Sequence, residues 1–431
     1  MSFSNLGLST AVLQSIDELG HQSPTPIQTE AIPLVLAGHD LLAAAQTGTG
    51  KTGAFAMPII ERLKSRGSNG AGPRALVLAP TRELAAQVTA SFAGYARHTS
   101  LRVDAVFGGV GMHKQSASLR RGLDVLVATP GRLIDHLERR AARLSNVEIL
   151  VLDEADRMLD MGFLPAIRRI IDALPKSRQN LLFSATFSAE IRKFAATLLH
   201  EPRTVEVAPR NSTAANVVQR VHFVNQDNKR ALLLHLLRTE NWRQTLVFAR
   251  TKHGAERLAE QLEREGILAT AIHGNKSQNA RTRALAQFKQ GQVLVLVATD
   301  VAARGIDVER LSHVVNFDLP SSPEDYVHRI GRTGRAGASG EAVSLVSGAE
   351  RKQLRDIERM LGKSLSVVTV EGFETTSPAQ DTQRAASAEA GARRRHAAPR
   401  GQRPGTSHGH RRDNKGRSKQ AGSWKPSRGG H

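Results

Sequence analysis

The amino-acid sequence predicts an α/β protein built from two similar parallel sheets, each covered by helices on both faces. Short apolar runs rich in β-branched residues recur along the chain with helical patterns between them, which is typical of parallel sheets buried on both sides. The 431 residues suit two domains of ordinary size better than one. The pentapeptide VLVAT occurs twice, at 125–129 and 295–299, which favours two related halves.

The predicted strands fall into two groups on either side of a small polar linker at 208–216. In the first half we expect strands within 41–45, 75–80, 103–109, 125–130, 149–154 and 180–186. In the second half we expect them within 245–251, 269–274, 293–300, 313–320 and 341–347. The predicted domains are 1–207 and 217–374. Ligands of such sheets bind beyond the carboxyl ends of the strands, so we expect the working site there, in a cleft between the halves.

Residues 375–431 form a predicted disordered basic tail. They hold thirteen Lys and Arg against three Asp and Glu, about half of the formal net charge of +20. They contain no Val, Ile, Leu, Met or Phe, so burial of apolar surface cannot offset the entropy lost on ordering. We expect this mobile polycation to raise non-specific affinity for nucleic acid. The alternative is a solubilising extension without a partner; a metal site at His408 and His410 is disfavoured in such a segment.

Composition also restricts the cellular setting. The chain has no cysteine, which excludes disulfides and cysteine-based zinc sites and fits a reducing compartment. Its first twenty residues lack the layout of a signal peptide. No apolar run reaches the length of about eighteen residues that a membrane span needs. We therefore expect a cytoplasmic protein with no membrane segment.

The stretch AQTGTGKT at 45–52 predicts a phosphate-binding loop. It follows an apolar strand and precedes a helical pattern, so backbone N–H groups and a helix N-terminus would face phosphate oxygens. Lys51 would reach the β- and γ-phosphates, and Thr52 would ligate Mg²⁺. The usual pattern starts with glycine, and Ala45 fits that position if it needs a small residue rather than a positive φ. The alternative, a flexible Gly/Thr loop, is disfavoured by the strand and helix around it.

Two adjacent acids follow a later apolar strand, ILVL at 149–152. Asp153 suits Mg²⁺ coordination, and Glu154 suits polarisation of an attacking water. A solvated acidic helix start, favoured by the helix dipole, is the alternative. A phosphate loop earlier in the chain makes the catalytic interpretation the better one.

Taken together, the motifs resemble those of DEAD-box RNA helicases, in order and spacing, over about residues 1–370. The motifs are SPTPIQ (23–28), AQTGTGKT (45–52), PTRELA (80–85), GG (108–109), TPGR (129–132), DEAD (153–156), SAT (184–186), VFART (247–251), HGNKSQNAR (273–281), ATDVAARGIDV (298–308) and YVHRIGRTGR (326–335). The resemblance implies two tandem RecA-like domains, a Q motif and the cofactors ATP and Mg²⁺. HGNKSQ and the short amino-terminal extension are similar to the bacterial RhlE-like branch.

The resemblance also implies roles for single residues in an ATP site. Gln28 would bond the adenine edge, and His21 stands where the family keeps an aromatic residue that stacks on adenine. Arg332 and Arg335 match the arginine fingers, although an exposed basic turn is the alternative. Ser184, Thr186 and His328 match residues that couple hydrolysis to domain closure, although Ser and Thr near strand ends are often only capping groups. The predicted nucleotide-binding set is Phe3, His21, Gln28, Ala45, Gln46, Thr47, Gly48, Thr49, Gly50, Lys51, Thr52 and the ribose contact Asp307.

The predicted RNA contacts lie beside the strand ends of both halves. They are Thr81, Arg82, Gly109, Thr129, Arg132, Arg250, Gly274 and Thr299. Hydroxyls, N–H groups next to glycines and guanidinium groups suit the nucleic-acid backbone rather than the bases, so we expect sequence-tolerant binding. The chain has only two Trp and two Tyr, so we do not expect it to bind RNA by stacking the bases on aromatic side chains.

We predict a monomeric, ATP-dependent RNA helicase that grips RNA when ATP binds and releases it after hydrolysis. Ribosomal RNA and RNA-decay complexes are both compatible partners. Two alternatives stay open: an RNA-binding or annealing scaffold whose ATPase is incidental, and a DNA-directed motor.

Overall fold

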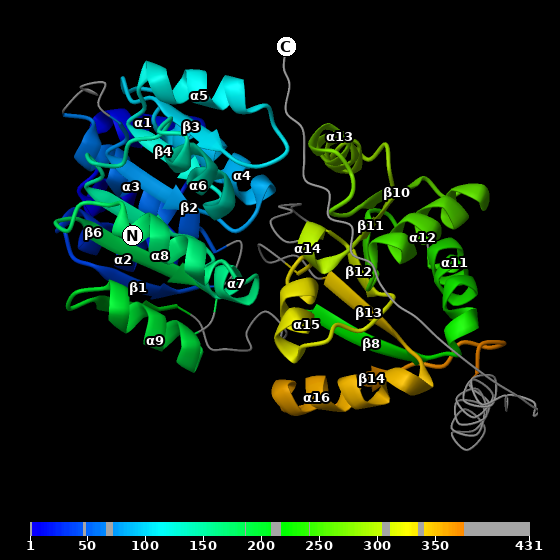
Figure 1. The fold of residues 1–431 in the computed structure, drawn as a ribbon. Coiled ribbons are helices and arrows are strands. Elements are labelled where there is room, and N and C mark those ends of the chain that lie inside the picture. Colours follow the sequence, from blue (N-terminus) through cyan, green and yellow to red (C-terminus); the bar gives the residue numbers. More distant parts are fainter. Residues whose placement is uncertain are drawn as a thin grey trace, which may run out of the picture. The chain divides into compact units, whose positions relative to one another are not determined.

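The computed structural model describes residues 2–45, 49–65, 72–185, 187–207, 217–240, 242–303, 311–334 and 340–374. The predicted linker at 208–216 and the predicted tail at 375–431 lie outside these ranges. We call residues 2–207 the first lobe and residues 217–374 the second lobe. Their domain boundaries stay a prediction, but each lobe contains one sheet (Figure 1).

The first lobe is built on a sheet of seven parallel strands. In spatial order they are β3 (Val103–Val106), β4 (Val125–Ala128), β2 (Ala75–Leu78), β5 (Ile149–Leu152), β6 (Gln179–Ser184), β1 (Leu41–Ala44) and β7 (Arg203–Glu206). The inner strands are fully buried, which explains their continuous apolar sequences.

Helices cover both faces of this sheet, because side chains alternate between the two faces along each strand. Leu41 and Ala43 point into one apolar core, whereas Leu42 and Ala44 point into another. The first core is closed by α1 (Thr10–Glu18), α2 (Pro26–Leu36), α3 (Lys51–Leu63) and α4 (Arg82–Tyr95), with the short turn η1 (Phe3–Leu6). The second is closed by α6 (Pro130–Glu138), α7 (Ala155–Asp160), α8 (Leu164–Asp172) and α9 (Ala189–Leu198), while α5 (Met112–Arg121) packs beside β3.

The second lobe repeats this architecture with seven further parallel strands. Their order is β10 (Ala269–Ile272), β11 (Val295–Ala298), β9 (Thr245–Phe248), β12 (His313–Asn316), β13 (Gly340–Val346), β8 (Val217–Phe223) and β14 (Ser366–Val367). One face is covered by α11 (Lys229–Thr239) and α12 (Lys252–Arg264). The other is covered by α13 (Gln278–Lys289), α14 (Asp300–Ala303), α15 (Pro323–Ile330) and α16 (Arg351–Leu361).

The two copies of VLVAT occupy equivalent places in the two sheets. The first forms β4 and the second forms β11, and each is the second strand from one edge. In both, Val-Leu-Val-Ala is the strand and the threonine follows its carboxyl end. The repeat therefore reflects two lobes of one topology.

All eleven strands that the sequence predicts are present. It did not predict three strands, β7, β8 and β14. β7 is an edge strand of the first sheet, and β8 and β14 are the two outermost strands on one side of the second. Among the described residues, no helix combines the length and the apolar character that crossing a membrane requires.

Candidate nucleotide and RNA site

The phosphate loop leads directly into α3, whose first residue is Lys51. Gly50 has a φ of +91°, which L side chains rarely adopt. A Cβ atom there would also lie 2.7 Å from Gln28 Nε2 and from Thr25 Oγ1. Position 50 therefore requires glycine on two independent grounds. Gln46, Thr47 and Gly48, also predicted for this site, lie outside the described residues.

Ala45 continues strand β1 instead of forming a tight turn. Its N–H donates to the Ser184 carbonyl at 3.1 Å, and its side chain is buried in the core of the first lobe. It is not among the described non-glycine residues with positive φ. An alanine is therefore compatible with this position, which calls for a small residue.

Two buried charged groups next to the loop have no hydrogen-bond partner. These atoms are the Lys51 ammonium nitrogen and Asp153 Oδ1, on residues that are 6% and 2% exposed. Burial raises the pKa of Asp153 to about 7, although the positive charge of Lys51 opposes the shift. Leaving charged groups unpaired in a protein interior is costly, so the pair indicates a site built for a charged ligand.

The unbonded carboxylate oxygen of Asp153 suits Mg²⁺. In the described part of the chain, no three His, Asp or Glu side chains gather into a metal-binding group. Mg²⁺ needs no such group, because it is commonly held by one or two carboxylates together with phosphate oxygens and water. The free Asp153 oxygen, in the lobe that carries Thr52 at the start of α3, fits that kind of site.

Glu154 is held in an unusual backbone conformation at the end of β5. Its φ and ψ are both 54°, a left-handed geometry that is uncommon outside glycine and clusters at functional sites. Burial alone would raise the pKa of its carboxyl, but Arg157, Lys51 and Arg332 together lower it to about 2. Glu154 is therefore ionised at neutral pH, and Arg157 pairs with it directly.

The Gln28 amide retains the capacity to bind a base. Its Oε1 accepts from Thr25 N at 3.0 Å, and its Nε2 donates to the Gly50 carbonyl at 3.1 Å. A primary amide has a second lone pair and a second N–H, which is the combination that pairs with an adenine edge.

His21 is exposed nearby, whereas Phe3 is buried in the core. Asp307, the predicted ribose contact, lies outside the described residues.

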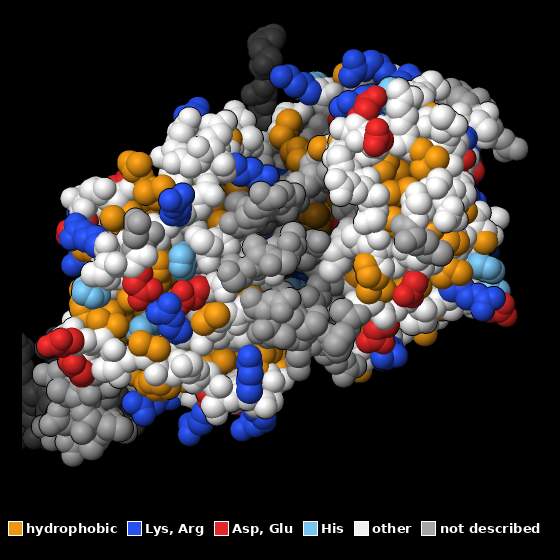
Figure 2. All heavy atoms as spheres, turned by 180° about the vertical axis from the view of Figure 1, so that it is seen from behind, with side chains coloured by type: hydrophobic (Ala, Val, Ile, Leu, Met, Phe, Trp, Pro, Cys, Tyr) orange, Lys and Arg blue, Asp and Glu red, His pale blue; other side chains and the backbone are white. Residues whose placement is uncertain are grey.

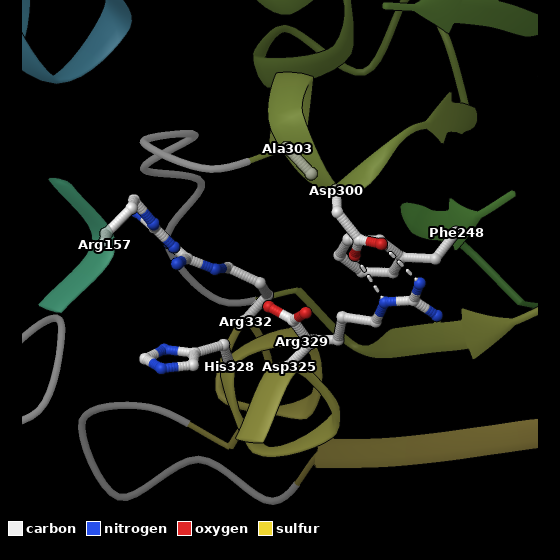
Figure 3. A pocket seen from close by; sticks show the side chains of 8 residues that line it. All are labelled: Arg157, Phe248, Asp300, Ala303, Asp325, His328, Arg329 and Arg332. Carbon is white, nitrogen blue, oxygen red and sulfur yellow. Dashed lines mark hydrogen bonds and ion pairs between the residues drawn. The ribbon is translucent and has the colours of Figure 1, made fainter. Parts of the chain in front are cut away.

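Arg157 of the first lobe and residues of the second line one pocket (Figure 3). Figure 3 shows the guanidinium groups of Arg157 and Arg332 pointing toward one another, with the His328 ring beside them. Burial lowers the pKa of His328, and the positive charges of Arg157 and Arg332 lower it further. The imidazole is therefore neutral, and the positive charge comes from the arginines. Arg335, the second predicted finger, lies outside the described residues.

A fixed ion pair forms the opposite wall of this pocket. Arg329 donates to both carboxylate oxygens of Asp300, at 2.6 and 2.7 Å (Figure 3). Its guanidinium also lies 4.8 Å from the centroid of the Phe248 ring. Bidentate pairing and ring packing together fix the arginine in one orientation. This ties α14 to α15, which carries His328 and leads into Arg332.

The acids after β5 are linked to the end of β6. Asp156 Oδ2 accepts from the Ala185 N–H at 2.9 Å, and the preceding Ser184 is fully buried. A shift of α7 would therefore be transmitted to the SAT segment. Thr186, the other predicted coupling residue there, lies outside the described residues.

The predicted RNA residues of the first lobe lie where strands end and helices begin. Thr81 caps α4 by accepting from Leu84 N at 3.2 Å, and Thr129 precedes α6. Arg132 is held by the Val110 carbonyl at 2.9 Å. Arg82 packs against Gly109, where a Cβ atom would lie 2.1 Å from its Nη1.

Of the predicted RNA residues of the second lobe, Arg250 and Gly274 are exposed and Thr299 is buried. Arg250 is 56% exposed at its side chain and pairs with Glu350 at 3.1 Å, while Gly274 is exposed. Thr299 follows β11 as Thr129 follows β4. On the face drawn in Figure 2, Lys and Arg side chains are spread in separate groups.

Several residues at this site escaped sequence reasoning. Glu83 and Arg281 form a buried ion pair of 3.0 Å between α4 and α13, and Gln278 donates to Glu83 at 3.1 Å. Asp156 is part of the DEAD motif, but its hydrogen bond to Ala185 spans 29 positions. The contacts of Glu83 with Gln278 and Arg281 span 195 and 198 positions. Arg157 lies just after the DEAD motif and pairs with Glu154. No local sequence pattern reveals these contacts.

Comparisons with known proteins agree with the site. Residues 25–194 match the DEAD/DEAH box helicase family, and residues 228–337 match the helicase conserved C-terminal domain. The DEAD-box ATP-dependent RNA helicase RhpA of Helicobacter pylori is 42% identical over 369 residues, 86% of this chain and 74% of that protein. CshA of Bacillus cereus is 43% identical over 358 residues, 83% of this chain and 68% of that protein.

Solved structures show the same fold. S. cerevisiae Dbp5 bound to RNA and ADP BeF3 aligns with a TM-score of 0.78 at 31% identity, covering 90% of this chain and 99% of that one. DEAD-box helicase Mss116 bound to ssRNA and UDP-BeF aligns with a TM-score of 0.79 at 26% identity, covering 91% of this chain and 86% of that one.

Fold and site thus define a two-lobed protein with tandem RecA-like domains and a phosphate loop. The chain belongs to the DEAD-box ATP-dependent RNA helicase family. The relatives described above do not place it in the RhlE-like branch, which stays a prediction.

Replacing the buried Asp153 carboxyl with a neutral amide should stabilise the fold, and the gain in unfolding free energy should depend on pH. The unfolded chain ionises this group near pH 3.8, whereas the folded protein does so near pH 7. Its cost to folding therefore grows as the pH rises between these values and is constant above them. We expect Asp153→Asn to increase the free energy of unfolding of the nucleotide-free protein by about 1–3 kcal/mol more at pH 8 than at pH 5.

Calorimetry or urea unfolding at the two pH values would measure this difference. Asp172→Asn, which changes an exposed carboxylate of the same lobe, is the control and should show no such gain. An equal effect of Asp153→Asn at both pH values would contradict the raised pKa.

Proposed function

We propose that this protein is an ATP-dependent RNA helicase that binds RNA when ATP draws its lobes together, locally separates short duplexes and hydrolyses ATP to ADP and phosphate. The observation that carries the proposal is the set of buried charges around the phosphate loop. The Lys51 ammonium nitrogen and Asp153 Oδ1 are buried without a hydrogen bond, and the positive charge of Arg332 in the second lobe helps to lower the pKa of Glu154 in the first. A site that joins catalytic groups from two lobes makes hydrolysis depend on their arrangement.

Within this site, Lys51 would neutralise the β- and γ-phosphates, and the backbone at the start of α3 would bind phosphate oxygens. Glu154, ionised and held by Arg157, would orient the attacking water and accept its proton. Thr52 and Asp153 would hold Mg²⁺, which would offset the charge that develops on the phosphates. Arg332, with Arg335, would stabilise that charge from the second lobe.

Base selection would follow from Gln28. Its free lone pair and free N–H match the amino group and ring nitrogen of adenine, so ATP would be preferred over GTP. His21 would lie against the base and Asp307 would contact the ribose.

RNA would bind to the strand-end groups of both lobes. Dbp5 and Mss116, which share the fold, were both solved with RNA. The eight predicted contacts are hydroxyls, backbone N–H groups beside glycines and guanidinium groups, which suit phosphates and sugars. Binding would therefore tolerate many sequences. Ribosomal RNA and RNA-decay complexes are suitable targets in the cytoplasm.

We expect Glu154→Gln to separate binding from turnover. The amide keeps the size of the carboxylate but cannot accept a proton, so ATP and RNA should bind with at most a few-fold change while hydrolysis falls by about a hundredfold or more. Steady-state ATPase assays and titrations with fluorescent ATP measure the two properties. Lys51→Ala is the paired variant and should lose nucleotide affinity itself.

Normal ATPase activity in Glu154→Gln would remove Glu154 from the proposal. Unchanged ATP binding in Lys51→Ala would remove the phosphate loop. Duplex separation that proceeds equally well without ATP would favour the annealing scaffold over the helicase.

The basic tail at 375–431 would add non-specific RNA affinity to the core. A chain ending at Glu374 should therefore bind RNA more weakly and with a shallower dependence on salt, because fewer counterions are released. Binding isotherms at several salt concentrations measure this slope. The truncated chain should retain ATPase activity, since every proposed catalytic residue lies before position 375. An unchanged salt slope would mean that the tail only solubilises the protein.

A further inference from the structure

His21 has a buried hydrogen-bond partner that the sequence motifs do not reveal. It lies in the loop between α1 and α2, and its Nε2 is 3.2 Å from the hydroxyl of Tyr95, the last residue of α4. The two ring centroids are 5.9 Å apart, with the planes inclined at 38°. Tyr95 is 7% exposed, whereas His21 is exposed. A ring fixed in the core thus contacts a ring at the surface.

The Tyr95 hydroxyl also lies against the start of α3. A Cβ atom at Gly53 would be 3.2 Å from Tyr95 Oη and 2.7 Å from Gln28 Nε2. Gly53 is the third residue of α3, two positions after Lys51. His21, Tyr95 and Gln28 are therefore grouped around the first turn of the helix that follows the phosphate loop.

The hydrogen bond joins the Tyr95 hydroxyl to an imidazole nitrogen that can accept it. Burial raises the pKa of the hydroxyl to about 12, so the phenol keeps its proton and can donate to His21 Nε2 when the imidazole proton is on Nδ1. An exposed histidine without this contact would sample several rotamers, and binding would have to order it.

We propose that Tyr95 is a positioning residue for the nucleotide base. Its hydroxyl fixes the plane of the His21 imidazole next to the Gln28 amide, so that a small ring stacks on the base as a preorganised surface. This inference rests on the proposed function, because it requires that a nucleotide base occupies the site beside Gln28.

The test compares probes with and without a base. Tyr95→Phe removes only the hydroxyl, and we expect the affinity for ADP to fall about 3-fold to 10-fold, as expected for the loss of one ordinary hydrogen bond. The affinity for inorganic tripolyphosphate, which has no base, should stay unchanged. Fluorescent ADP measures the first affinity by titration and the second by competition.

The chain offers a matched control in its only other tyrosine. Tyr326 is fully buried in the second lobe and donates to Gln219 Oε1 at 3.1 Å. Tyr326→Phe therefore removes a buried, hydrogen-bonded hydroxyl in the other lobe, and it should leave ADP affinity unchanged. Thermal unfolding of each variant shows whether a change in ADP affinity comes from a general loss of stability.

A double-mutant cycle separates positioning from packing. Phenylalanine at position 21 cannot accept the hydrogen bond, so Tyr95→Phe should cause no further loss of ADP affinity in a His21→Phe background. Because His21 is exposed, His21→Phe should leave the fold intact and is a sound background for this comparison. His21→Ala, which leaves Tyr95 unchanged, should lower ADP affinity without changing tripolyphosphate affinity, and unchanged ADP affinity in this variant would also contradict the inference.

Three results would overturn this inference and leave the proposed function standing. They are unchanged ADP affinity in Tyr95→Phe, the same loss of affinity in both backgrounds, and an equal loss of ADP and tripolyphosphate affinity, which would indicate a general disturbance of the loop. Failure of the unaltered protein to bind ADP would overturn the proposed nucleotide site and this inference together.

Discussion

The site depends on two charged groups that the fold buries with polar atoms left without a hydrogen bond. Lys51 begins α3 and Asp153 directly follows β5, and neither the Lys51 ammonium nitrogen nor Asp153 Oδ1 has a hydrogen-bond partner. Such charges destabilise a protein unless a ligand completes the arrangement. The rigid parallel sheet supplies the stability that this requires, because its inner strands are fully buried. A nucleotide with its metal is the kind of ligand that satisfies both charges at once.

The second lobe contributes further polar and charged groups to the site. Its sheet repeats the strand order of the first, so its strand-end loops present a second set of polar groups. The positive charge of Arg332 lowers the pKa of Glu154, and Glu83 forms an ion pair with Arg281, so charges of the two lobes interact at two places. Both interactions are sensitive to small shifts, because electrostatic interaction weakens as buried charges separate.

Much of this architecture could be predicted from the sequence, because inner strands are continuous apolar runs bounded by turn residues. The strands that were missed lie toward sheet edges, where one face or edge contacts water. β7 buries only Val205, and β8 alternates buried and exposed residues, so neither has a continuous apolar signal. Lys51, Asp153 and Glu154 could be predicted because their motifs are local. Arg329 with Asp300 and Tyr95 with His21 could not, since each pair joins elements that only the folded chain brings together.

The central claim is that the buried ATP site serves RNA. The most direct measurement is the ATPase rate with single-stranded RNA, with DNA of the same sequence and with neither. We expect a slow ATPase rate without nucleic acid, clear stimulation by RNA and little stimulation by DNA, because recognition of the sugar requires the 2′-hydroxyl. Equal stimulation by both nucleic acids would indicate a DNA-directed or indiscriminate motor. An ATPase rate that neither RNA nor DNA changes would contradict the proposal that RNA binding is coupled to ATP hydrolysis.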